Sequence, residues 1–167
     1  MVATNSPSPA IAYHRTMKTL LVMRHAKSSW DNPRQTDHER PLNDRGRKDA
    51  PFMAARIAAL ELNLAAVVSS DATRAHETAE AVADELSLPL STTPDLYHAT
   101  VDDWRRVVAG FDAGWSGAIG VAHNPGIGEL LLRLGGDGHV PTACVLHLRL
   151  PSWDGLLDAE LVDVLKP

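Results

Sequence analysis

Arginine and histidine residues directly follow apolar segments of this chain, in an arrangement that suits the binding of an anion. Arg24 and His25 follow one short apolar run, Arg74 lies just beyond a second, and His123 and Asn124 follow a third. Guanidinium groups bind phosphate through paired hydrogen bonds, and a neutral imidazole is a nucleophile near neutral pH. If these residues meet in the fold, they have the chemistry that phosphoryl transfer needs.

Short apolar runs predict the strands that must position these side chains. Each run is bounded by polar residues, as is typical of strands buried on both faces of a parallel sheet. The predicted strands cover residues 19–23, 64–69, 89–92 and 118–122. Near the C-terminus, apolar and polar residues alternate over residues 144–150. The turn sequence PSWDG follows, and then an extended run over residues 156–164. Together they predict a closing antiparallel hairpin.

Four helices are expected between these strands. The first begins at Asn43 or Asp44 and ends near residue 60, the second follows Asp71 as its N-cap, the third covers residues 102–109, and the fourth runs from Asn124 as N-cap and Pro125 to about residue 134. The alternation of predicted strands and helices along the chain predicts an α/β fold, a three-layer sandwich in which a mostly parallel sheet carries helices on both faces. Ligands bind outside the carboxyl ends of parallel strands, so the residues after the strands should meet at one edge.

Composition narrows the possible functions. The chain has 167 residues and a formal net charge of −5, which argues against a general nucleic-acid binder. Residues 24–48 are nevertheless locally positive, with seven basic and four acidic side chains. Cys144 is the only cysteine, so an intramolecular disulfide is impossible and a cysteine-based zinc site is not expected.

The organisation of the chain is predicted to be simple. Residues 1–16 are rich in Ser, Pro, Thr and Ala and are interpreted as a disordered extension or an over-annotated start, with Met17 as an alternative initiator. Residues 17–167 are expected to form a single domain. No apolar stretch approaches the roughly 20 residues of a membrane span, so a cytoplasmic protein without a membrane partner is the simplest interpretation.

Each motif also has an ordinary structural explanation. Arg24 could be an ion-pair partner and His25 could be satisfied by backbone groups. The segment SDATRAHETAE could be only a capped amphipathic helix, and AHNPG only a turn between a strand and a helix. These explanations, taken together, do not account for a cation or an imidazole after every buried strand.

Four segments in order resemble the histidine phosphatase superfamily, which has the phosphoglycerate-mutase-like fold: LLVMRHAKSSW, ERPLNDRGRKDAPFMA, VVSSDATRAHETAE and VAHNPGIGELL. The resemblance extends from about residue 18 to residue 148. Within the superfamily the chain is most similar to the short SixA-type phosphohistidine phosphatases, and Ala26 is typical of that group. The resemblance implies that His25 is a nucleophile that forms a phosphohistidine intermediate, which water then cleaves.

The expected roles follow from this chemistry. Arg24 and Arg74 would stabilise the phosphoryl oxygens, and His123 would donate a hydrogen bond to them in a protonated state when substrate is bound. Further substrate-binding residues are expected at Asn124, Lys27, Ser28 and Arg45. No metal or cofactor is needed, because the arginines supply the positive charge. Trp30 is expected at the rim, as a partner contact or as an edge of the core.

The sequence does not place a general acid. The candidates, none of them fixed by a motif, are Asp95, His98, Asp102 and Asp103. Asp102 and Asp103 are better explained as the acidic first turn of a helix. A site without a strong acid suits a leaving imidazole better than a leaving alkoxide, because the imidazole is far less basic.

The predicted function is therefore a metal-independent phosphohistidine phosphatase. Its partner would be a protein that carries phosphohistidine, such as a histidine phosphotransfer domain. Two alternatives remain open, a small-molecule phosphomonoesterase of the same superfamily and a non-catalytic module that binds phosphohistidine. No feature of the sequence indicates an oligomeric state.

Overall fold

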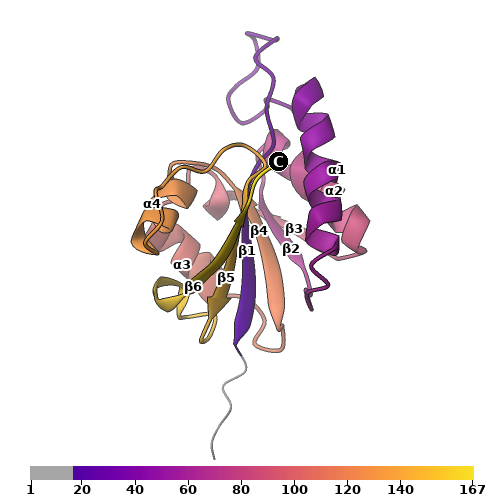
Figure 1. Ribbon diagram of the computed structural model, residues 1–167. Helices are drawn as coiled ribbons and strands as arrows, with labels where there is room; N and C mark the ends of the chain where they lie inside the picture. Colours follow the sequence, from indigo (N-terminus) through magenta and orange to yellow (C-terminus); the bar gives the residue numbers. More distant parts are fainter. Residues whose placement is uncertain (1–16) are drawn as a thin grey trace, which may run out of the picture.

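A six-stranded sheet forms the centre of the structure, a computed structural model that describes residues 17–167 (Figure 1). The predicted extension of residues 1–16 lies outside the described residues. The strands are β1 (Lys18–Arg24), β2 (Val67–Ser70), β3 (Leu90–Thr93), β4 (Gly117–Ala122), β5 (Val145–Leu150) and β6 (Glu160–Leu165). They lie in the order β3-β2-β4-β1-β5-β6.

Four of these strands are parallel and end at the same edge of the sheet. β1 pairs in parallel with β4, β4 with β2, and β2 with β3. β5 pairs antiparallel with β1, and β6 pairs antiparallel with β5. The expected mostly parallel sheet with a C-terminal antiparallel pair is therefore confirmed.

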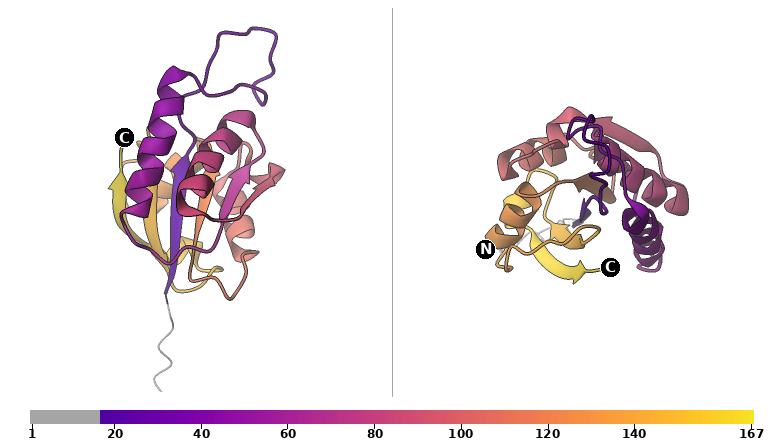
Figure 2. Two further views of the ribbon diagram at one scale, coloured as in Figure 1. Left: turned by 90° about the vertical axis from the view of Figure 1, so that its right-hand side faces the viewer. Right: turned by 90° about the horizontal axis from the view of Figure 1, so that it is seen from above.

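Helices cover both faces of the sheet (Figures 1 and 2). The helices are α1 (Asp44–Ala58), α2 (Thr73–Leu86), α3 (Val101–Ala109) and α4 (Gly126–Arg133), with short 3-10 helices η1 (Pro94–Leu96) and η2 (Leu156–Asp158). Successive side chains of a strand point to opposite faces. Accordingly Leu21 packs in one core with Met53 of α1, whereas Leu20 packs in the other with Trp104 of α3. None of the helices within residues 17–167 has the length and apolar character to cross a membrane.

Two predicted helix caps, Asp71 and Asn124, are wrong, because each of these side chains bonds to a segment elsewhere in the chain. α2 begins at Thr73 after Ala72, and the Asp71 carboxylate instead pairs with His38 Nε2 at 2.9 Å. α4 begins at Gly126 after Pro125, and the Asn124 amide donates to the carbonyl oxygen of Val140 at 3.1 Å. The cap of α1 is confirmed, since the side chain of Asn43 accepts a hydrogen bond from the Gly46 backbone at 2.9 Å.

Two element boundaries also differ from the prediction. β2 begins at Val67 rather than at residue 64. Residues 156–158, expected to be extended, form η2 because the chain turns there to bury Leu156 together with Trp153, and the strand begins only at Glu160.

Close packing fixes the start of α1 against the segment that follows β1. A Cβ atom on Gly46 would lie 2.1 Å from the carbonyl oxygen of Lys27, so only glycine fits there. The backbone N–H of Asn43 also donates to that oxygen at 2.9 Å. The first turn of α1 is therefore held directly beside the residues that leave β1.

Candidate active site

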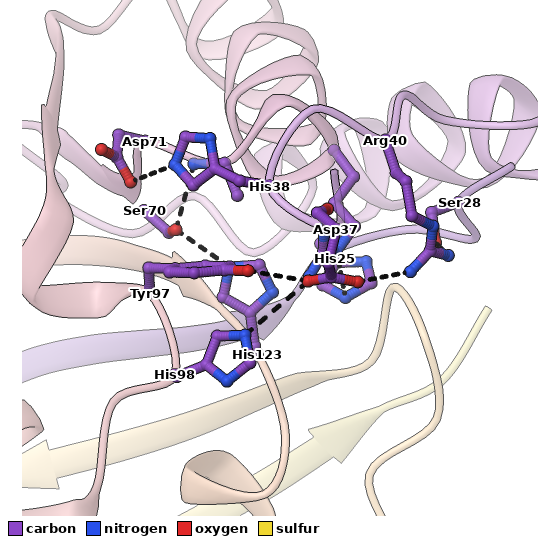
Figure 3. Close-up of polar contacts among 12 residues, drawn as sticks. His25, Ser28, Asp37, His38, Arg40, Ser70, Asp71, Tyr97, His98 and His123 are labelled. Carbon is purple, nitrogen blue, oxygen red and sulfur yellow. Dashed lines mark hydrogen bonds and ion pairs between the residues drawn. The ribbon is translucent and has the colours of Figure 1, made fainter. Parts of the chain in front are cut away.

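The ends of three parallel strands bring the predicted residues together around one cavity of about 400 Å³. Figure 3 shows two of them, His25 and His123, with their polar neighbours. Arg24 ends β1 and His25 follows it, while His123 follows β4. Arg74 lies in the first turn of α2, just after β2. The His25 backbone N–H donates to the Ala122 carbonyl at 2.9 Å, which fixes His25 beside His123.

The His25 ring presents an unprotonated nitrogen to the cavity. Nδ1 lies 2.7 Å from the carbonyl oxygen of Ala26, and since a carbonyl only accepts, Nδ1 carries the hydrogen. Nε2 therefore carries the lone pair of the ring, and the Arg74 Nε–H donates a hydrogen bond to it at 3.3 Å. Burial, with the neighbouring guanidinium groups of Arg74, Arg24 and Arg40, lowers the pKa of His25 to about 4. The ring is thus neutral at neutral pH.

His123 faces His25 across the cavity. The ring centroids are 4.9 Å apart and the ring planes are tilted by 55°. His123 Nε2 lies 2.9 Å from Ser70 Oγ. Burial, followed by the proximity of His25 and Arg74, lowers the pKa of His123 to about 2, so without a ligand this ring is neutral. An adjacent phosphoryl anion would oppose this shift, because an opposite charge favours the protonated form.

Three buried polar atoms around the cavity have no partner within the described residues. They are Arg24 Nε, His123 Nδ1 and Asn124 Oδ1, and the fourth such atom of residues 17–167 is Trp104 Nε1 in the core. Buried polar groups in proteins are nearly always hydrogen-bonded. Their gathering at one cavity fits a site that binds a polar ligand.

An acidic residue that the sequence did not single out lies at the centre of the rim. The Asp37 carboxylate accepts hydrogen bonds from Arg40 Nη1 at 2.7 Å, Arg74 Nη2 at 2.9 Å and the Tyr97 hydroxyl at 2.8 Å (Figure 3). Partial burial opposes its ionisation, but these hydrogen bonds hold the pKa of Asp37 well below its usual range. Asp37 is therefore a carboxylate under all ordinary conditions.

Arg40 is the second unexpected residue, and it organises the loop between β1 and α1. It is 7% exposed, and its Nε donates to the carbonyl oxygen of Ser29 at 2.9 Å. Its Nη2 donates to the hydroxyl of Ser28, and its guanidinium lies 3.2 Å from the ring centroid of Trp30. Arg40 thereby presents Asp37 to the cavity.

The other predicted binding residues divide into two groups. Asn124, Lys27 and Ser28 line the cavity, as does the rim residue Trp30. Arg45 does not: it borders a neighbouring hollow of about 610 Å³ and pairs with Asp49 at 3.1 Å, because the first turn of α1 points it along its own helix.

The general-acid candidates also divide. His98 lines the cavity, with Nε2 3.7 Å from Asp37 Oδ2. Asp95 and Asp102 are exposed and lie outside the cavity lining. Asp103 closes a capping box with Thr100 at the start of α3, as its position in a first turn suggested.

Comparison with known proteins agrees with this geometry. Residues 20–110 match the family model of the histidine phosphatase superfamily (branch 1). The chain belongs to this superfamily. Among solved structures, this histidine phosphatase superposes on a candidate SixA phosphohistidine phosphatase from Nakamurella multipartita with a TM-score of 0.77 and 27% identity, over 90% of this chain and 96% of the other. A second candidate SixA phosphohistidine phosphatase, from Agrobacterium tumefaciens, superposes with a TM-score of 0.78 and 23% sequence identity. The superposition covers 90% of this chain and 98% of the other.

Two further matches complete the comparison. The histidine phosphatase SixA in complex with tungstate gives a TM-score of 0.77 at 24% identity, over 89% of this chain and 97% of the other. An uncharacterized chloroplastic protein of Arabidopsis thaliana is 41% identical over 73 residues, which are 44% of this chain but only 31% of the plant protein. The fold of this histidine phosphatase is therefore that of the SixA structures, and its superfamily is the one that the motifs suggested.

The two buried imidazoles predict that acid destabilises this histidine phosphatase well above pH 4. Unfolded histidines titrate near pKa 6.5, whereas the folded values are about 4 for His25 and about 2 for His123. Between these limits the unfolded chain binds more protons, so the free energy of unfolding falls as the pH is lowered. At about 1.4 kcal/mol per pKa unit, His25 alone accounts for a loss of about 2–3 kcal/mol between pH 7 and pH 4.5.

Urea denaturation at pH 7 and pH 4.5 measures this loss. His25→Asn should reduce it markedly, whereas His139→Asn, at an exposed histidine, should leave it as in the wild type. An identical loss in wild type and His25→Asn would contradict the prediction.

Proposed function

We propose that this histidine phosphatase hydrolyses phosphohistidine on a protein partner, through a phosphoryl group carried transiently by His25. The observation that carries the proposal is the geometry of His25. Its Nε2 is unprotonated and accepts only a long hydrogen bond from Arg74 Nε at 3.3 Å, and its ring is neutral and fixed by Ala26.

In the first step, Nε2 of His25 attacks phosphorus and the bond to the leaving group breaks. The equatorial oxygens collect negative charge, which Arg24 and Arg74 stabilise without having to reorganise. The unpartnered Nε of Arg24 and Nδ1 of His123 supply the hydrogen-bonding capacity that these oxygens need. In the second step, water attacks phosphorus and the bond between phosphorus and Nε2 of His25 breaks, with its electron pair returning to Nε2. The proton of the water leaves with inorganic phosphate, and His25 is neutral again.

The nature of the acids around the cavity supports phosphohistidine rather than a phosphate ester. An alkoxide leaving group needs a proton, and general acid catalysis of that step commonly contributes 10²–10⁴-fold. Asp37 is held ionised and has no proton to give. Of the four general-acid candidates only His98 lines the cavity, and the carboxyl groups of Asp95, Asp102 and Asp103 lie outside it. A leaving imidazole is far less basic than an alkoxide and needs less help.

The mouth of the cavity supports a protein as substrate. Trp30 is 73% exposed, and both it and the exposed Lys27 line the cavity. Aromatic side chains are enriched at protein interfaces. They offer a partner a contact surface next to the reacting phosphoryl group.

A comparison of substrates tests the proposal. We expect hydrolysis of a phosphohistidine-bearing phosphotransfer protein to exceed that of sugar phosphates clearly in kcat/KM. A preference for the sugar esters would instead identify a small-molecule phosphomonoesterase. Release of phosphate from an aryl phosphate by wild type but not by His25→Ala separates an enzyme from a module that only binds phosphohistidine.

A further inference from the structure

A carboxylate at the mouth of a phosphate site is electrostatically unexpected. Asp37 has 42% of its side chain exposed and lies at the rim of the cavity that His25 and Arg74 line. Its negative charge repels the phosphoryl anion that the site is built to hold. Ion pairs with Arg40 and Arg74 compensate part of this charge, but they leave a carboxylate facing the site.

The charge becomes useful if the leaving group brings a hydrogen-bond donor. We propose that Asp37 selects phosphohistidine by accepting a hydrogen bond from the substrate ring nitrogen that does not carry phosphorus. This inference rests on the proposed function and assigns a specificity-determining residue to it. Sugar and alkyl phosphates have no N–H group in the corresponding place.

The chemistry of the leaving imidazole requires a proton on that nitrogen. When His25 Nε2 forms its bond to phosphorus, the phosphorus–nitrogen bond of the substrate breaks and its electron pair stays on the ring nitrogen. If the second ring nitrogen carries hydrogen, the product is a neutral imidazole, and no proton has to move in this step. Without that hydrogen the product would be an imidazole anion, a much poorer leaving group. A carboxylate facing the N–H group stabilises the reactive, protonated ring.

Asp37 has the capacity and the position for this contact. A carboxylate can accept about four hydrogen bonds, and Arg40, Arg74 and Tyr97 supply three. Arg74 bridges the Asp37 carboxylate and the His25 imidazole, since its Nε donates to His25 and its Nη2 donates to Asp37. The carboxylate therefore lies one guanidinium group away from the attacking nitrogen.

Aromatic rings flank the carboxylate on the side of the substrate. The ring of His98 lies edge-on to Tyr97, with centroids 4.1 Å apart, and Tyr97 lies edge-on to His123 at 5.4 Å (Figure 3). His98 has a positive φ of 52°, a backbone conformation that is uncommon for residues other than glycine. Tyr97, His98 and Asp37 together form a rim of flat rings around one acceptor, which suits a flat ring that carries an N–H group.

Asp37 also positions Arg74, and a test must separate the two roles. Arg74 keeps two other partners that do not depend on the charge of Asp37, namely the carbonyl oxygen of Asp37 and Nε2 of His25. Asp37→Asn retains a side-chain oxygen that can accept from Arg74 or Tyr97. The variant therefore removes the charge while most of the support for Arg74 remains.

The experiment compares phosphoimidazole with p-nitrophenyl phosphate in wild type and Asp37→Asn. We expect kcat/KM for the aryl ester to fall only several-fold, through the weaker hold on Arg74. For phosphoimidazole we expect a further loss of about ten- to a hundredfold, as is usual when a hydrogen bond to a charged group is lost. Inhibition by inorganic phosphate should become tighter in the variant, because the repelling charge is gone.

Asp31→Asn is the matched control, since Asp31 is an exposed carboxylate of the same loop that borders only the neighbouring hollow. It should leave the ratio of the two substrates unchanged. Equal losses on both substrates in Asp37→Asn, with weaker phosphate inhibition, would reduce Asp37 to a positioning residue and overturn the inference. A wild type that does not prefer phosphoimidazole over aryl esters would contradict the proposed function itself.

Discussion

Replacing His25 with asparagine should stop turnover and prevent any phosphoryl group from remaining on the enzyme. Asparagine can still donate to the carbonyl oxygen of Ala26, which His25 Nδ1 contacts at 2.7 Å, so the local structure should persist. It has no nucleophilic nitrogen in place of Nε2. Loss of a covalent nucleophile commonly costs about 10⁴–10⁶-fold in kcat.

Two measurements check this result. One is the rate of p-nitrophenyl phosphate hydrolysis, and the other is a rapid alkaline quench followed by mass spectrometry, which maps a phosphoryl group in the wild type. His76→Asn is the control, because His76 lies on the surface of α2 beside Glu80. A phosphorylated residue other than His25, or a His25→Asn variant with near-normal activity, would contradict the mechanism.

Arg74→Lys should lower kcat by about 10²–10³-fold, the usual cost of removing one group that stabilises transition-state charge. Lysine keeps the positive charge but lacks the planar fork that contacts His25 through Nε and Asp37 through Nη1 and Nη2. The effect should therefore appear mainly in kcat, since charge attraction to the substrate remains. Steady-state kinetics with p-nitrophenyl phosphate measures the division between kcat and KM.

Arg45→Lys makes a matched control for this prediction. Arg45 resembles Arg74 in type, but it borders the neighbouring hollow and pairs with Asp49. Its replacement should change kcat less than twofold, as is usual for exposed ion pairs that contribute little. If Arg74→Lys were equally mild, Arg74 would not stabilise the reacting group.

The sequence predicted the core of the site because strand ends follow a simple rule. Once residues 19–23 and 118–122 are recognised as parallel strands, the residues after them must lie at one edge. The predicted meeting of Arg24, His25, Arg74 and His123 needed no knowledge of side-chain packing, and the same four residues line one cavity in the structure.

The rim of the site was not predictable in the same way. Residues 27–42 form a loop without periodicity, and a string of charged residues does not reveal which of them is buried. Arg40 is buried only because Ser28, Ser29 and Trp30 fold back onto it. Three side chains hold the Asp37 carboxylate at the cavity, namely Arg40, Arg74 and Tyr97, and the last of these lies sixty positions away in the sequence. The mistaken caps at Asp71 and Asn124 share this cause, since His38 and Val140 are remote partners.

The pairing of β1 with β4 has a consequence for biosynthesis. Arg24 and His25 leave the ribosome early, but Ala122 and His123, which complete their surroundings, follow almost a hundred residues later. β5, the other neighbour of β1, is translated later still. A nascent chain therefore holds His25 without the facing half of the pocket for most of translation, and the cavity is complete only when the C-terminal third has emerged.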